Sequence, residues 1–99
     1  SYISSFKNVK GVPGEIINAM AAGIKAEIAV EKKDYAKAAT LFEQAAKLSE
    51  NDFTTPMYLR KAALVYKQLG QEEKAKEIYK TIKESYSSSY DAREAEKNL

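Results

Sequence analysis

Carboxylates and amines supply most of the side chains here that could do chemistry, because the chain contains neither histidine nor cysteine. Their absence removes imidazole bases, thiolate nucleophiles, disulfides and the usual zinc ligands. The four glycines are scattered and form no phosphate-binding loop. Glu72 precedes Lys76 by four residues, and Glu43 precedes Lys47 by four, which is the spacing of weak ion pairs on a helix surface. We therefore expect no enzyme activity, no metal site and no cofactor.

Glu27 and Glu31 differ from these pairs, since two like charges one helical turn apart repel slightly and stabilise nothing locally. We interpret them as candidate contacts for a partner.

The seven tyrosines could form a stacking surface for single-stranded nucleic acid, but Tyr35, Tyr66 and Tyr79 fall on apolar stripes. Because the net charge is only +2, no nucleic-acid binding is expected.

The length of 99 residues predicts one domain. No apolar run approaches the roughly 18 residues of a membrane-spanning helix, and no signal peptide opens the chain, so direct membrane insertion is not expected. The chain lacks a first methionine, begins on the apolar cluster Tyr2, Ile3 and Phe6, and stops at Leu99 among helix-favouring residues. We interpret it as a segment of a longer protein.

Apolar residues recur three and four positions apart along most of the chain, which predicts an all-α fold. Turn residues divide it into the tail of a preceding helix (1–7), a first helix pair (14–50), a second pair (55–86) and the start of a further or capping helix (91–99). In the first helix, over 14–32, one apolar stripe contains Ile17, Ala21, Ile24 and Ile28. Asp34 is the expected N-cap of the next helix, and Asp91 with Glu94 forms an expected capping box.

The two helix pairs repeat a spacing of small and aromatic residues. At offsets 0, 3, 12, 16 and 19 the first pair has Ala26, Ala29, Ala38, Phe42 and Ala45, and the second has Ala63, Tyr66, Ala75, Tyr79 and Ile82. The stretch "LRKAALVYKQLGQEEKAKEIYKTI" resembles the tetratricopeptide repeat family. The stretch "AAGIKAEIAVEKKDYAKAATLFEQA" resembles it less closely, because Ala22, Lys25 and Lys33 differ from the residues usual in that family. The resemblance implies stacked antiparallel helix pairs in a right-handed superhelix. The alternative is a four- or five-helix bundle whose alanine spacing is accidental.

The same resemblance implies a protein-interaction scaffold, because the first helix of each unit in that family lines a concave groove for a peptide or a partner helix. The positions carried over from the first unit are Met20, Gly23, Ile24, Glu27, Val30 and Glu31, and those from the second are Met57, Arg60, Lys61, Leu64, Lys67 and Gln68. Arg60, Lys61 and Lys67 would form a basic strip facing Glu27 and Glu31, or simply a solvated helix face. Gly23 and Glu27 stand where a subfamily that binds chaperone C-termini has its carboxylate clamp, so that activity is not supported.

The stretch "KAKEIYKTIKESY", a serine-rich break and "DAREAEKNL" resemble repeats of bacterial cell-envelope proteins. That resemblance implies a place in the bacterial periplasm or envelope through an anchor outside the segment, with a cytoplasmic location as the alternative. Two other functions stay open: a regulatory or docking segment of a larger enzyme, and a self-assembly element that forms a homodimer through the terminal helices.

The stretch "NDFTTPMY" joins the two pairs and lengthens the repeat, since Ala38 and Ala75 are 37 residues apart against a usual period of about 34. We expect Thr54 or Thr55 to cap the next helix and Phe53 to pack back onto it as a hydrophobic staple.

Overall fold

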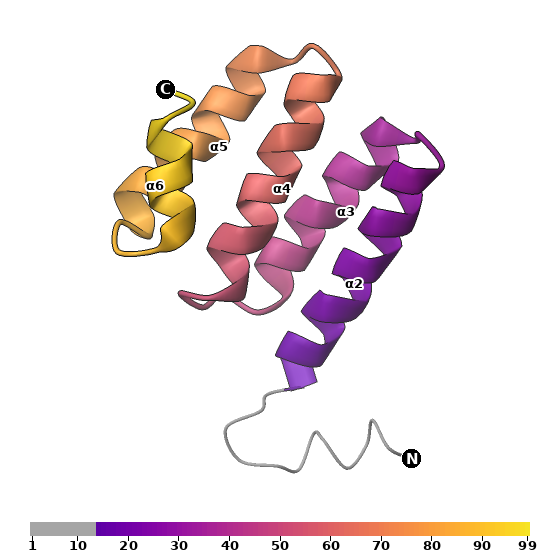
Figure 1. Cartoon of the computed structure of the whole chain (residues 1–99). Helices are drawn as coiled ribbons and strands as arrows, with labels where there is room; N and C mark the ends of the chain where they lie inside the picture. The colour runs from indigo at the N-terminus through magenta and orange to yellow at the C-terminus, as the bar shows by residue number, and fades with distance from the viewer. Residues whose placement is uncertain (1–13) are drawn as a thin grey trace.

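The computed structural model describes residues 14–99, so the expected helix tail over 1–7 and its apolar cluster lie outside the described residues. Five helices and no strand are found in this range, which confirms the all-α fold class (Figure 1). Their bounds are α2 Gly14–Glu31, α3 Tyr35–Leu48, α4 Thr54–Gln68, α5 Glu72–Ser85 and α6 Tyr90–Glu96.

Antiparallel helix pairs stack side by side in this fold. Each helix packs against its neighbour in sequence, while α2 also touches α4 and α4 also touches α6. The helices therefore form two layers, with α2, α4 and α6 in one and α3 and α5 in the other, in a body of 42 × 33 × 15 Å. The last helix, α6, lies along the C-terminal half of α5 (Figure 1).

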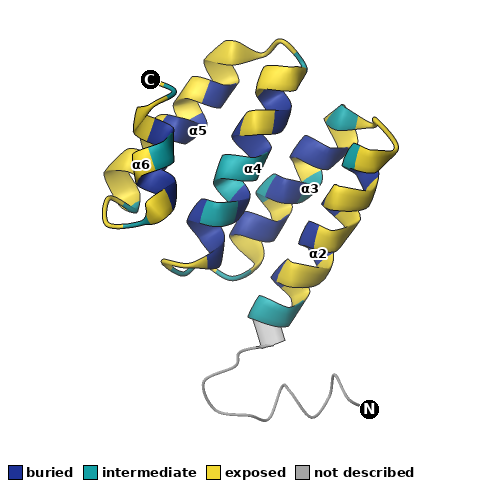
Figure 2. Ribbon diagram, in the orientation of Figure 1, coloured by how far each residue is buried: buried dark blue, intermediate teal, exposed yellow. Residues whose placement is uncertain are grey.

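The core follows the repeated spacing, since all ten residues of the two matched sets are buried. Ala26, Ala38 and Ala63 are fully excluded from solvent, and the absence of larger side chains there lets the helices approach closely. Phe42 and Tyr79 are both 1% exposed and fill the wider spaces between the pairs. Figure 2 shows buried residues along the facing sides of neighbouring helices.

The apolar stripe expected on the first helix is not its buried face. Ile24 and Ile28 are 61% and 47% exposed, Ala21 is also exposed and Ile17 is only partly buried. The face that α2 buries consists of Ala19, Ala22, Gly23, Ala26 and Ala29. Small and large apolar residues occur on several sides of α2, so hydrophobic period alone does not choose between them. Close approach by the neighbouring helices selects the small ones.

The two pairs turn through the same backbone conformation at equivalent positions. Lys33 has φ 62° in the α2–α3 turn, and Gly70 has φ 80° in the α4–α5 turn. Glycine adopts this left-handed conformation without penalty, whereas lysine does not. Directly after Lys33, Asp34 caps α3 as expected, since its carboxylate accepts from the Lys37 N–H at 3.4 Å.

The joint between the pairs is capped by Asn51, which corrects the expectation for Thr54 or Thr55. The Asn51 Oδ1 accepts from the N–H groups of Phe53 and Thr54 at 2.8 and 2.7 Å. The Thr55 hydroxyl instead contacts the carbonyl oxygens of Ala46 and Ser49 at the end of α3. Phe53 is 79% exposed, so the expected staple is also wrong.

The last helix begins one residue before the expected capping box. Ser89 is its N-cap, and the Ser89 hydroxyl accepts from the Ala92 N–H at 3.0 Å. Asp91 is therefore inside α6 and is buried, with an exposed fraction of 8%. Its carboxylate pairs with Arg60 of α4 instead of capping a helix. The helix ends at Glu96, not at Leu99.

Candidate functional site

A seam between α2 and α4 gathers exposed apolar side chains on one face of the molecule. Met20 and Ile24 of α2 are 49% and 61% exposed, and Met57 of α4 is partly buried beside them. Together with Gly23 and Tyr58 they line a shallow depression of about 140 Å³. Apolar side chains left in contact with water at one place are a common feature of binding surfaces.

Gly23 shapes this depression because it leaves room for an aromatic ring. A Cβ atom at Gly23 would lie 2.5 Å from Cε1 of Tyr58 and 2.7 Å from its Cζ. The ring is buried, and it stacks on Phe42 of α3 with centroids 6.4 Å apart. Burial raises the pKa of Tyr58, while nearby Lys61 partly opposes that rise. The floor of the depression is thus a neutral ring of α4 that packs against α2 and α3.

An ion pair crosses the seam at the edge of the same depression. Lys61 Nζ of α4 lies 2.7 Å from Glu27 Oε2 of α2. Lys61 also lies above the ring of Phe42, at 5.9 Å from its centroid. The two charged side chains are 32% and 54% exposed, so the pair contributes little to stability. Their remaining hydrogen-bonding atoms are accessible to a ligand.

A second shallow depression, of about 280 Å³, lies at the other end of the seam. Its lining consists of Val30, Tyr35, Leu64, Val65 and Gln68. Leu64 is 47% exposed, while Val30 packs against the edge of the core. The seam therefore has an apolar patch toward each end and an ion pair at the first of them.

Arg60 is directed toward α6, and Lys67 toward the residues that follow it. Arg60 Nε lies 2.6 Å from Asp91 Oδ1, and its guanidinium lies 5.8 Å from the centroid of the Tyr90 ring. Lys67 Nζ donates to Asn98 Oδ1 at 3.0 Å. Each cation of the expected strip thus has a partner within the chain, and Lys61 pairs with Glu27, one of the two glutamates that the strip was expected to face.

The structure distributes the twelve expected groove residues over four places. The first depression includes Met20, Gly23, Ile24, Glu27, Met57 and Lys61, and the second includes Val30, Leu64 and Gln68. Arg60 and Lys67 face α6 and the residues that follow it, and Glu31 is exposed at the end of α2 and lines neither depression. Tyr58 and Asp91 were not anticipated as part of this surface. The repeat register could have suggested Tyr58, since it lies on the stripe of Ala62 and Tyr66.

Tyr66 links the two helix pairs below the seam. Its hydroxyl donates a hydrogen bond to the carboxylate of Glu43 on α3. Burial, and then this hydrogen bond, raise the pKa of Tyr66 to about 12. Because the charged form is disfavoured, Tyr66 stays a neutral donor at physiological pH.

Neither a metal cluster nor a membrane-spanning helix is found within residues 14–99. No cluster of three acidic side chains in this range could hold a metal ion. None of its helices is both long and apolar enough to cross a bilayer. What the seam offers is apolar contact and hydrogen bonding to a ligand of matching shape.

Successive antiparallel helix pairs with small residues at matched positions define a helical-repeat protein. A family model described as "Tetratricopeptide repeat" matches residues 21–52 and 55–88, one match for each helix pair. The chain therefore belongs to the tetratricopeptide repeat family. The comparison with curated proteins gave no match, and neither did the comparison with solved structures. Repeats of this family generally mediate contacts between proteins.

Proposed function

We propose that the chain is a non-catalytic interaction scaffold that binds an extended peptide or a partner helix along the seam between α2 and α4. The observation that carries this proposal is the exposure of Met20 and Ile24 around a depression whose edge holds the Lys61–Glu27 pair. Apolar side chains supply contact area, and methionine adapts its shape to different ligands. The ion pair offers a hydrogen-bond donor and an acceptor, and the backbone of a bound peptide carries one of each per residue.

The spacing along the seam also suggests what kind of peptide fits. An apolar side chain at each depression and a polar stretch over Lys61 and Glu27 would match the surface. A ligand carrying both charges complements the ion pair better than a uniformly acidic or basic one. Glu31, exposed beyond the second depression, remains a candidate contact at the rim.

The chain's two methionines allow a direct test, because both lie at the first depression. Peptides selected by display against the chain would be titrated into protein labelled with ¹³C at the methionine methyl groups. We expect the methyl signals of Met20 and Met57 to shift on binding. We also expect Ile24→Asp to weaken binding by about tenfold or more, which corresponds to roughly 1.4 kcal/mol.

Ile28→Asp is the matched control, since Ile28 lies on the same helix with a similar exposed fraction but outside the seam. This change should leave the affinity within about twofold, a difference of a few tenths of a kcal/mol. Saturation by a peptide without methionine shifts, together with equal effects of the two variants, would place the binding site elsewhere and refute the proposal.

We further propose that the scaffold works within a bacterial multi-repeat protein of the periplasm or cell envelope, with cytoplasm as the alternative. The support is the similarity of "KAKEIYKTIKESY" and "DAREAEKNL" to envelope repeats. Fractionation of cells that carry the parent protein, followed by detection of this segment, is the test. Recovery in the cytoplasmic fraction alone would contradict the envelope location.

Two alternative roles make different predictions. A docking segment of a larger enzyme requires a catalytic domain in the parent sequence. A self-assembly element requires a concentration-dependent dimer, which light scattering across about a hundredfold concentration range would detect; a dimer at Kd near 1 µM corresponds to about 8 kcal/mol.

A further inference from the structure

A cavity of about 320 Å³ opens away from the seam, between the end of α4, the first half of α5 and the residues that follow α6. Because α6 lies along the other half of α5 and ends at Glu96, it leaves this part of α5 uncovered (Figure 1). The polar side chains of the lining are Lys67, Glu72, Lys76, Tyr79, Lys97 and Asn98. None of them lines either depression of the seam.

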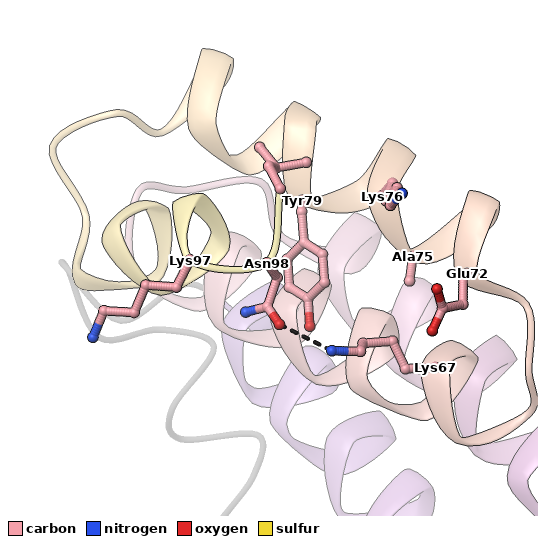
Figure 3. A pocket seen from close by; sticks show the side chains of 8 residues that line it. Lys67, Glu72, Ala75, Lys76, Tyr79, Lys97 and Asn98 are labelled. Carbon is pink, nitrogen blue, oxygen red and sulfur yellow. Dashed lines mark hydrogen bonds between the residues drawn. The ribbon is translucent and has the colours of Figure 1, made fainter.

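The hydroxyl of Tyr79 is the unusual group in this cavity. Tyr79 is 1% exposed, and within residues 14–99 its buried hydroxyl has no hydrogen-bond partner. Leaving such a group unpaired costs about 1–3 kcal/mol. Figure 3 shows its ring directed from α5 toward α4, with the hydroxyl beside the side chains of Lys67 and Asn98.

Core packing does not account for the hydroxyl. The equivalent residue of the first helix pair is Phe42, which is also 1% exposed and carries no polar atom. A phenylalanine therefore fits this position of the repeat. The difference between the two rings is a buried hydrogen-bond donor on a residue that lines the cavity.

Further donors line the same cavity as Tyr79, and a hydrogen-bond acceptor is the ligand that suits them. Lys67 Nζ donates one hydrogen bond to Asn98 Oδ1, which leaves two of its three N–H groups available. Lys76 also lines the cavity and brings a second positive charge to it. Glu72 opposes them with one negative charge. Lys97 does not count, because its ammonium bonds to Glu94 at 3.1 Å and extends away from the cavity in Figure 3.

We propose that this cavity binds a carboxylate of an acidic peptide segment, with the Tyr79 hydroxyl and Lys67 Nζ donating to its oxygens. A carboxylate accepts several hydrogen bonds at once, and bonds from a charged donor are the stronger kind. Inorganic phosphate shares this chemistry. The choice of a peptide rests on the proposed function, since α4 contributes to both the seam and the cavity.

The test is an NMR titration of the ¹⁵N-labelled chain at constant ionic strength. The probes are acetylated and amidated tetraglutamate, the matching tetraglutamine and inorganic phosphate. We expect tetraglutamate, and not tetraglutamine, to shift the amide signals of Tyr79 and Asn98. Tyr79→Phe and Lys76→Gln should each raise the Kd for tetraglutamate by about threefold or more, as expected for the loss of one hydrogen bond or charge. Glu72→Gln should lower it.

Lys80→Gln is the matched control, since Lys80 is an exposed lysine of α5 that does not line the cavity. Its Kd should change by less than about twofold, and the urea midpoint of Tyr79→Phe should not fall. Equal effects of Lys80→Gln and Lys76→Gln would show general charge attraction and overturn the proposal. So would tighter binding to Lys76→Gln, or the absence of shifts at Tyr79 with tetraglutamate.

Failure of this inference can be told apart from failure of the function on which it rests. Shifts with phosphate but not with tetraglutamate would overturn the assignment to a peptide carboxylate. If selected peptides still shift the methyl signals of Met20 and Met57 while the cavity stays silent, only the cavity proposal fails. If those methyl signals also stay unchanged, the proposed function fails with it.

Discussion

Replacement of Gly23 by alanine should destabilise the protein, although alanine is the better helix former. Within a helix, Gly→Ala stabilises by about 1 kcal/mol. Here the new Cβ would lie 2.5 Å from Cε1 and 2.7 Å from the oxygen of Tyr58, and the first of these is at least about 1 Å inside normal contact. The ring stacks on Phe42 and is only 6% exposed, so it cannot retreat without disturbing the core.

The size of the effect follows from these two opposing contributions. Overpacking of a buried contact costs about 1–3 kcal/mol. After subtraction of the helix-propensity gain, Gly23→Ala should lower the free energy of unfolding by roughly 1 kcal/mol. In a Tyr58→Leu background the overlapping ring atoms are gone, so the same change should stabilise by about 1 kcal/mol. The sign therefore reverses, with a coupling energy of about 1–3 kcal/mol.

Urea unfolding of the four proteins of this cycle measures the effect, with midpoints compared at constant m-value. Asn18→Ala, at an exposed position of the same helix, calibrates the propensity gain in this host. If Gly23→Ala changed stability by the same amount in both backgrounds, this would refute the explanation that the close approach of α2 to the Tyr58 ring requires glycine at position 23.

Three further predictions concern the turns, the tyrosine between the pairs and the docking of α6. Lys33→Gly should stabilise by about 0.5–1 kcal/mol, since relief of the left-handed backbone exceeds the added unfolded-state entropy, and Gly70→Lys should destabilise; urea midpoints that move in the same direction would contradict this. As pH rises from about 10 to about 12, unfolded protein loses the Tyr66 proton while folded protein keeps it, so stability falls by up to roughly 2–3 kcal/mol; Tyr66→Phe should flatten that fall in urea midpoints measured from pH 8 to 12. Asp91→Asn should destabilise by about 1–3 kcal/mol, and an undiminished loss in an Arg60→Gln background would exclude their ion pair as the cause.

The core was predictable because the sequence repeats it. Ala26 and Ala63 are small at the same point of each unit, and small residues at helix contacts reflect how closely two backbones approach. Such a constraint is local and periodic, so it is visible in one sequence. The aromatic positions Phe42 and Tyr79 follow the same period and are buried to the same degree.

Other features depend on contacts that no local pattern contains. Asp91 looked like a helix cap because of its neighbours, but its partner Arg60 is 31 positions away and on another helix. In the joint, Asn51, Thr54 and Thr55 each have a side-chain oxygen suited to capping. The choice among them depends on the end of α3, because the carbonyl oxygens of Ala46 and Ser49 accept from the Thr55 hydroxyl. The N–H groups at the start of α4 then bond to Asn51.

The exposed isoleucines show a further limit. Ile24 and Ile28 have the hydrophobicity of core residues, yet both remain exposed because alanines occupy the contacts on α2. Burying such a side chain stabilises by about 1.5–3 kcal/mol, and the fold leaves this stabilisation unused at the two isoleucines. A ligand that covers Ile24 would gain it as binding free energy.

The two units are similar at the positions that pack the core and differ at the positions along the seam. Where the helices touch one another, both units have small or aromatic residues at four of the five matched positions, and Ile82 takes the place of Ala45 at the fifth. Along the seam, Met57 repeats Met20, but Lys61 stands at the position of Ile24 and Leu64 at the position of Glu27. Because of this exchange the ion pair joins different positions of the two units, Glu27 and Lys61, and neither unit alone could form it. A ligand of the seam would therefore contact features that exist only when both helix pairs are stacked, which couples binding to the integrity of the repeat array.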